Sequence, residues 1–247
     1  MSDLENFDPD WLALREPLDH ATRSARLEEL LVPALAGRPA LRIVDLGAGS
    51  GSTLRHLAPR LAELGVEAEQ HWLLVDHDEE LLQRALATPV PAATSVRTAR
   101  VDLGDPDALR SVLTGADLVV GSALLDVLPA TVADTLLDGL SALEPRPAVL
   151  FVLTVTGGAT TEPPAPGAAA GFDADQRSHG LGPDAVEFCV AGFAARGWTV
   201  AREPTPWRLA DSPLLQEWAR GWFGAVGIEA PAVTSAVVPH EDLLALP

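Results

Sequence analysis

The sequence predicts an α/β fold: a seven-stranded, mostly parallel sheet with helices on both faces and an antiparallel last strand. Two observations support this prediction. Short apolar runs alternate along the chain with segments whose apolar residues recur at helical spacing, which is typical of strand–helix–strand units. Each predicted strand also ends close to a polar or glycine-containing loop, and 247 residues suffice for one domain of this kind.

Apolar residues at helical spacing predict helices over 23–36, 54–64, 79–87, 106–113 and 131–143. Short apolar runs between them predict strands over 41–46, 71–76, 96–101, 117–122 and 149–155. The last of these runs is apolar on both faces, so we expect that strand to be central. Further along the chain we expect a helix over 182–197, a strand over 198–203, a helix over 214–226 and a last strand within 234–246.

The composition excludes several classes of function. With 35 acidic and 17 basic residues, the chain has a formal net charge of −18, which disfavours nucleic acid or a membrane surface as a partner. Every basic residue is an arginine, which excludes a Walker-type phosphate loop and a lysine Schiff base. The single cysteine, Cys189, lies among apolar residues, so we expect a packed thiol. His20, His71 and His240 lack metal-ligand spacing, and no metal is predicted.

The chain shows no targeting signal. Residues 1–10 are acidic and lack the apolar core of a signal peptide. No stretch approaches the roughly 20 apolar residues that a membrane span requires. We therefore expect a cytoplasmic protein.

The strongest motif is a glycine-rich segment between the first strand and the second helix, Val44-Asp45-Leu46-Gly47-Ala48-Gly49-Ser50-Gly51-Ser52. Glycines permit a tight turn and a close approach of ligand to backbone, and the amides that open the following helix face whatever binds there. A dinucleotide fingerprint would need a third glycine three residues after the second. In the two possible registers Ser52 or Leu54 stands at that position, so both registers fail.

This segment resembles the first motif of class I S-adenosylmethionine-dependent methyltransferases, in which an acid precedes a Gly-x-Gly-x-Gly loop. Asp76 and Asp102 end the next two predicted strands, where that family binds the ribose hydroxyls and the adenine. Residues 117–126 resemble the fourth motif, which passes beneath the transferable methyl group. The resemblance implies a Rossmann-like fold and a cofactor site formed by Asp45, Gly47, Ala48, Gly49, Gly51, Asp76, His77, Asp102, Leu103, Ser122 and Arg23.

A narrower likeness appears at both ends of the chain. Four segments look like an uncharacterised bacterial subfamily of methyltransferases that itself supplies no substrate: 14–19, 21–23, 172–182 and 206–209. This likeness implies that one arginine, Arg23, faces the methionine carboxylate of the cofactor. It also implies contacts to the acceptor from Arg15, Gln176, Arg177 and Trp207.

Two residues are candidates for catalysis. Asp126, just after the fourth strand, is a candidate base or substrate anchor, and the alternative is a cap for the helix that begins near Pro129. His179 is a candidate base, and the alternative is an ordinary polar loop residue. Trp218 and Trp222 share one helical face, which fits core packing, an aromatic wall of the acceptor pocket or a dimer contact.

The expected function is methyl transfer from S-adenosylmethionine to a small soluble acceptor, leaving S-adenosylhomocysteine. Two alternatives stay open. One is another reaction of the same cofactor, such as cyclisation, elimination or aminocarboxypropyl transfer. The other is a cofactor-binding protein without catalysis.

We expect residues 1–247 to form one domain, as a monomer or a homodimer. Residues 157–171 are rich in Gly, Ala, Pro and Thr and lack an apolar period, so they predict a mobile loop, either a lid or a surface insertion. The expected parts are an N-terminal helical cover (1–36), a cofactor-binding half (41–155), a mobile loop or lid (157–181) and a substrate-side half (182–247).

Overall fold

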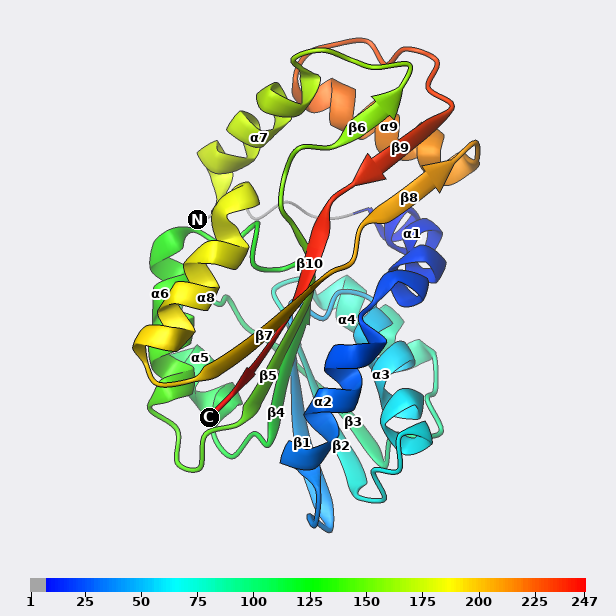
Figure 1. Cartoon of the computed structure of the whole chain (residues 1–247). Helices are drawn as coiled ribbons and strands as arrows, with labels where there is room; N and C mark the ends of the chain where they lie inside the picture. The colour runs from blue at the N-terminus through cyan, green and yellow to red at the C-terminus, as the bar shows by residue number, and fades with distance from the viewer. Residues whose placement is uncertain (1–7) are drawn as a thin grey trace.

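The computed structural model describes residues 8–247, in which seven strands form one sheet in the order β3-β2-β1-β4-β5-β10-β7 (Figure 1). Strand β10 pairs antiparallel with both β5 and β7, whereas the pairs formed among β1 to β5 are all parallel. The predicted fold class is therefore confirmed. The strands are β1 (Ala40–Leu46), β2 (Glu69–Asp76), β3 (Ser95–Arg100), β4 (Leu118–Ser122), β5 (Ala148–Val155), β7 (Thr199–Pro204) and β10 (His240–Leu246).

Helices cover both faces of this sheet (Figure 1). Side chains alternate along β1, so Ile43 belongs to the apolar cluster that contains Leu54 of α3, whereas Val44 belongs to the cluster that contains Leu136 of α6. The first face is covered by α2 (Ala25–Leu35), α3 (Ser52–Glu63) and α4 (Glu79–Ala87), and the second by α5 (Pro106–Leu113), α6 (Ala130–Ser141) and α8 (Ala185–Ala195). A single 3-10 turn, η1 (Gly182–Asp184), leads into α8. Cys189 of α8 is buried, as predicted.

A second layer lies beyond the carboxyl ends of the parallel strands (Figure 1). It contains a three-stranded antiparallel sheet in the order β6-β9-β8. Its strands are β6 (Thr160–Glu162), β8 (Trp207–Ala210) and β9 (Ser235–Val238), and its helices are α1 (Pro9–Thr22), α7 (Ala168–His179) and α9 (Pro213–Ala225). In the part of the chain from residue 8 onward, no helix is both long and apolar enough to cross a bilayer.

The second layer departs from the predictions in two places. Residues 157–181 were predicted as a loop, but they contain β6 and all of α7. Helix α7 packs on α9, with the ring centroids of Phe172 and Trp222 6.0 Å apart. Residues 234–246 were predicted as a single strand, but they form β9 and β10 on either side of Pro239, which has no N–H for a sheet ladder.

Candidate functional site

A cavity of about 1130 Å³ lies where the two layers meet. One side is lined by the loops that follow β1, β2, β3 and β4, and the other by side chains of α1, α7, α9 and the second sheet. Ligands of open parallel sheets bind outside the carboxyl ends of the strands, and this cavity is at that edge. Asp76, Asp102 and Ser122, at the ends of three strands, therefore line one crevice.

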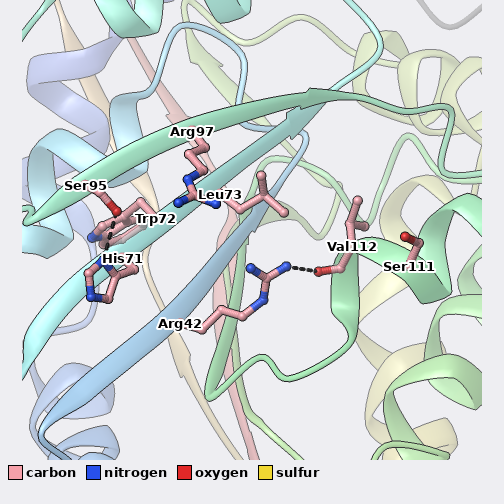
Figure 2. Close-up of a pocket in the computed structure, with 8 residues that line it drawn as sticks. All are labelled: Arg42, His71, Trp72, Leu73, Ser95, Arg97, Ser111 and Val112. Carbon is pink, nitrogen blue, oxygen red and sulfur yellow. Dashed lines mark hydrogen bonds between the residues drawn. The ribbon is translucent and has the colours of Figure 1, made fainter.

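A smaller hollow of about 500 Å³ lies near the opposite, amino ends of β1, β2 and β3 (Figure 2). Arg42 donates a hydrogen bond to the Val112 carbonyl at 3.0 Å, and Nδ1 of His71 is 2.8 Å from the Ser95 hydroxyl. None of the predicted site residues lines this hollow. The larger cavity is therefore the candidate site.

The glycine loop turns through left-handed backbone that favours glycine. Gly47, Gly49 and Gly51 have φ values of 62°, 52° and 85°. Of the predicted loop residues, Gly47, Ala48 and Gly49 line the cavity, but Gly51 does not. A Cβ on Gly51 would lie 3.0 Å from the Cβ of Ala85, so this glycine instead lets α3 begin close against α4.

Asp76 is oriented by the glycine loop. Its Oδ2 accepts a hydrogen bond from the Gly49 amide at 2.8 Å, and its Oδ1 accepts one from the Asp78 amide at 3.0 Å. The side chain lines the cavity and is 7% exposed, with His77 beside it at 3.2 Å. Because a carboxylate oxygen can accept two hydrogen bonds, each oxygen of Asp76 keeps one lone pair for a ligand.

The ends of β3 and β4 add further predicted residues to the same cavity. Oδ1 of Asp102 accepts a hydrogen bond from the Gly104 amide at 2.8 Å, which fixes the side chain in a tight turn. Leu103 is buried next to it, and both residues line the cavity together with Ser122 of β4. The end of β3 therefore offers a ligand one carboxylate, from Asp102, and one apolar contact, from Leu103.

Asp126 lines the cavity and is 6% exposed. Its Oδ1 has no hydrogen-bond partner within residues 8–247. Burial raises the pKa of Asp126 to about 6, although its own backbone amide and Arg15 lower it. Helix α6 begins at Ala130 without a side-chain cap, so the alternative role of Asp126 as a helix cap is wrong.

The predicted acceptor contacts Arg15, Gln176 and Trp207 also line the cavity, as does the candidate base His179. Nε of Arg15 donates to Oδ2 of Asp19 at 2.8 Å, and its guanidinium stacks 5.0 Å from the Trp207 ring centroid. Nε1 of Trp207 and Oε1 of Gln176 are buried and lack partners in the described chain. His179 is exposed on α7, with Nδ1 3.0 Å from the Asp175 carbonyl.

Besides Gly51, three predicted site residues do not line the cavity. Arg177 is exposed and pairs with Asp184 through two hydrogen bonds of 2.7 and 2.9 Å. Asp45 and Arg23 are buried in the protein interior, where Nη2 of Arg23 donates to the Thr53 hydroxyl at 3.2 Å. Burial, opposed by Arg23, raises the pKa of Asp45 to about 8. Sequence position alone does not give the direction of these side chains.

Aromatic residues of the second layer line the cavity as well. Trp218 and Trp222 stack with ring centroids 5.1 Å apart, and both are buried and face the cavity. They therefore serve core packing and form an aromatic wall at once. Trp11 and Phe172 line the same space but were not among the predicted site residues. Phe172 begins the 172–182 segment that resembles the methyltransferase subfamily, whereas nothing in the sequence singled out Trp11.

His240 is a further lining residue that was considered in the sequence only as a metal ligand. Its Nδ1 lies 2.9 Å from the Val238 carbonyl. Since a carbonyl oxygen only accepts hydrogen bonds, Nδ1 carries the proton and Nε2 presents a lone pair. Burial and the nearby Arg15 lower the pKa of His240 to about 3, so the ring is neutral.

The turn after α7 is docked tightly on the Asp126 loop. The amides of Leu181 and Gly182 donate to the carbonyls of Leu128 and Asp126 at 2.9 and 2.8 Å. A Cβ on Gly180 would lie 2.6 Å from the Asp126 carbonyl oxygen. This approach allows only glycine at position 180.

The Gly180→Ala variant should therefore lower the free energy of unfolding by about 1–3 kcal/mol, because the added methyl forces the backbone apart. Urea unfolding measures the change. Gly224→Ala is the control, since a Cβ at this position of α9 meets nothing within 4 Å. The control should be neutral or more stable by roughly 0.5–1 kcal/mol. Similar values for both variants would contradict the tight docking.

No protein-family model matches the chain, and no curated protein matches it. Solved structures do match. The YcgJ protein of Bacillus subtilis is similar with a TM-score of 0.59 and 11% identity, covering 90% of this chain and 98% of that one. The plantazolicin methyltransferase BpumL, solved with S-adenosylhomocysteine, is similar with a TM-score of 0.52 and 13% identity, covering 96% and 90%.

The methyltransferase domain of a bacterial Hen1 protein is also similar, with a TM-score of 0.51 and 13% identity over 94% of this chain and 99% of that one. At these identities the likeness concerns the fold. The chain has the Rossmann-like class I methyltransferase fold.

Proposed function

We propose that the chain is a methyltransferase that uses S-adenosylmethionine and acts on a small acceptor. The observation that supports this most directly is the convergence of the glycine loop, Asp76 and Asp102 on one cavity. The fold is shared with methyltransferases, one of which was solved with S-adenosylhomocysteine. The net charge of −18 opposes a nucleic-acid acceptor, because phosphates would be repelled.

The residues present fit this cofactor. Gly47 and Gly49 have left-handed backbone and carry no side chain, so a ligand can approach the loop closely at these two lining positions. Asp76 keeps two acceptor lone pairs, which suits the paired hydroxyls of a ribose. Asp102 can accept from an amino group, and Leu103 offers an apolar face to an adenine ring.

When bound, S-adenosylmethionine supplies a methyl group that is already activated on a sulfonium and leaves a neutral thioether. The residues of the chain then have three tasks. The aromatic wall at Trp218 and Trp222 excludes water, and the loops after β1 and β4 hold the partners in line. Asp126, buried and with a free Oδ1, is the base that takes a proton from the acceptor.

Two measurements test the proposal. Calorimetry with S-adenosylhomocysteine measures binding by the purified protein, and its absence would refute the cofactor assignment. Chromatography after incubation with S-adenosylmethionine and a metabolite panel identifies the product. S-adenosylhomocysteine indicates methyl transfer, whereas methylthioadenosine would indicate another reaction of the same cofactor. Binding without turnover across the panel would favour a non-catalytic role.

The Asp76→Ala variant should weaken binding of S-adenosylhomocysteine by about 1–3 kcal/mol, because buried hydroxyls lose their acceptor. Calorimetry at pH 7 measures the change. Asp107→Ala is the matched control, since Asp107 is an exposed carboxylate on α5 outside the cavity. Equal affinities for Asp76→Ala and the parent protein would mean that the ribose does not bind at β2.

A further inference from the structure

The part of the cavity formed by the second layer is aromatic. We call it the acceptor chamber and define it by Trp11, Phe172, Gln176, Trp207, Trp218 and Trp222. Trp218 and Trp222 are stacked, and Phe172 lies 6.0 Å from Trp222. Aromatic faces of this kind bind flat rings and attract cations through the ring quadrupole.

The charged residues around the acceptor chamber are predominantly acidic. Arg15 is the one arginine among the described residues that line the cavity. Its guanidinium already forms an ion pair with Asp19 at 2.8 Å and stacks on the Trp207 ring. Arg177, the other expected cation, points away and pairs with Asp184. The second layer and the loop after β4 contribute the lining carboxylates Asp8, Asp19, Asp126, Asp173, Asp175 and Glu217. An anionic acceptor would meet repulsion here.

The unpartnered polar atoms of the chamber match a ligand that donates hydrogen bonds. Oδ1 of Asp126 and Oε1 of Gln176 are buried acceptors without partners in residues 8–247. Nε2 of neutral His240 adds a third lone pair. The indole N–H groups of Trp207 and Trp222 are unpartnered donors, which ordered water can satisfy. Three hydrogen-bond acceptors beside one aromatic surface favour a ligand with an ammonium or another N–H group.

We propose that the acceptor is an arylalkylamine that binds as a cation, with its ring on the Trp218–Trp222 wall and its nitrogen at Asp126. The proposal rests on the proposed function. The ammonium first gives one proton to the Asp126 carboxylate. The nitrogen lone pair then forms the N–CH₃ bond as the C–S bond breaks and its electron pair stays on sulfur. The product leaves as an N-methylammonium.

Two probes of similar shape and opposite charge test this inference. Tryptamine is a cation and indole-3-propionate an anion, and calorimetry measures the binding of each to protein saturated with S-adenosylhomocysteine. We expect tryptamine to bind at least tenfold more tightly. Asp126→Asn should weaken tryptamine at least tenfold without weakening indole-3-propionate. Trp218→Leu should weaken both probes, because it removes an aromatic face but no charge.

Asp211→Asn is the matched control, since it removes an exposed carboxylate of the second layer outside the cavity and should affect neither probe. Equal or tighter binding of indole-3-propionate, no binding of tryptamine, or tryptamine binding indifferent to Asp126→Asn would overturn the inference. Binding of S-adenosylhomocysteine is measured first. If S-adenosylhomocysteine does not bind, the proposed function is refuted as well. If it binds but tryptamine is not preferred, only the inference of an amine acceptor is refuted.

Discussion

Replacement of Arg23 by methionine is expected to lower the free energy of unfolding at pH 7 by about 3–5 kcal/mol, because it removes one partner of a buried ionic cluster. Methionine fills a similar volume but carries no charge, so packing is largely kept while the cluster loses its cation. Chemical denaturation with guanidinium chloride measures the change in midpoint and slope.

The cluster holds several parts of the fold together. Asp242, Asp19 and Asp45 face Arg23, and the guanidinium lowers the pKa of each, although burial raises all three. Asp242 accepts hydrogen bonds from the Ser24 amide at 2.8 Å and the Leu153 amide at 2.8 Å, which ties α2 and β5 to β10. Without Arg23, Asp19 keeps only Arg15 as a cationic partner, and Asp45 and Asp242 stay buried without a cation to offset their burial.

The loss of stability caused by Arg23→Met should also depend on pH. An acid whose pKa in the folded protein lies above its unfolded value binds more protons when folded, so its presence lowers stability as pH rises. Asp45 already has its pKa raised to about 8, and loss of the guanidinium raises the pKa of its neighbours further. The variant should therefore lose more stability relative to the parent protein at pH 8 than at pH 5.

Arg26→Met is the matched control. Arg26 lies three residues further along, pairs with Glu203 and is 73% exposed. An exposed ion pair contributes at most about 1 kcal/mol, so this variant should remain close to the parent protein. An Arg23→Met deficit no larger than that of Arg26→Met would show that the cluster is not needed for stability.

The main sheet could be predicted because its signals are local and repeated. Helix α5 begins and ends as predicted at Pro106 and Leu113, since Asp105 caps its start and an apolar stripe runs along it. Asp76 and Asp102 were expected to converge, because parallel strands end at one edge of a sheet. The cavity contains both residues.

Helix α9 of the second layer was predicted, but α7 and the short strands of that layer were not, because their stability comes from tertiary contacts. Strands β6 and β8 have three and four residues, which is too short for an apolar period to appear. Helix α7 is rich in alanine and glycine at its start, and Phe172 packs it on α9. Side-chain direction was also beyond the sequence: Asp45 and Arg23 point into the core, whereas Arg177 points to solvent.

The Asp126→Asn variant is expected to slow methyl transfer by about 10²–10⁴-fold, the range typical of a lost general base. Asparagine has the same shape, so the loop after β4 should keep its conformation and affinity for S-adenosylhomocysteine should change little. Initial rates with the best amine acceptor at saturating S-adenosylmethionine measure the first effect, and calorimetry measures the second. Asp211→Asn is again the control and should match the parent protein in both.

The pH profile separates catalysis from a structural role. Burial raises the pKa of Asp126 to about 6, and only the ionised carboxylate can accept a proton, so the parent rate should rise with pH through about 6. Asp126→Asn should lack this rise, because an amide does not titrate there. If the variant kept the same rise, or lost cofactor affinity as much as rate, Asp126 would be a structural element of the β4 loop and the base would have to be sought elsewhere, first at the free Nε2 of His240.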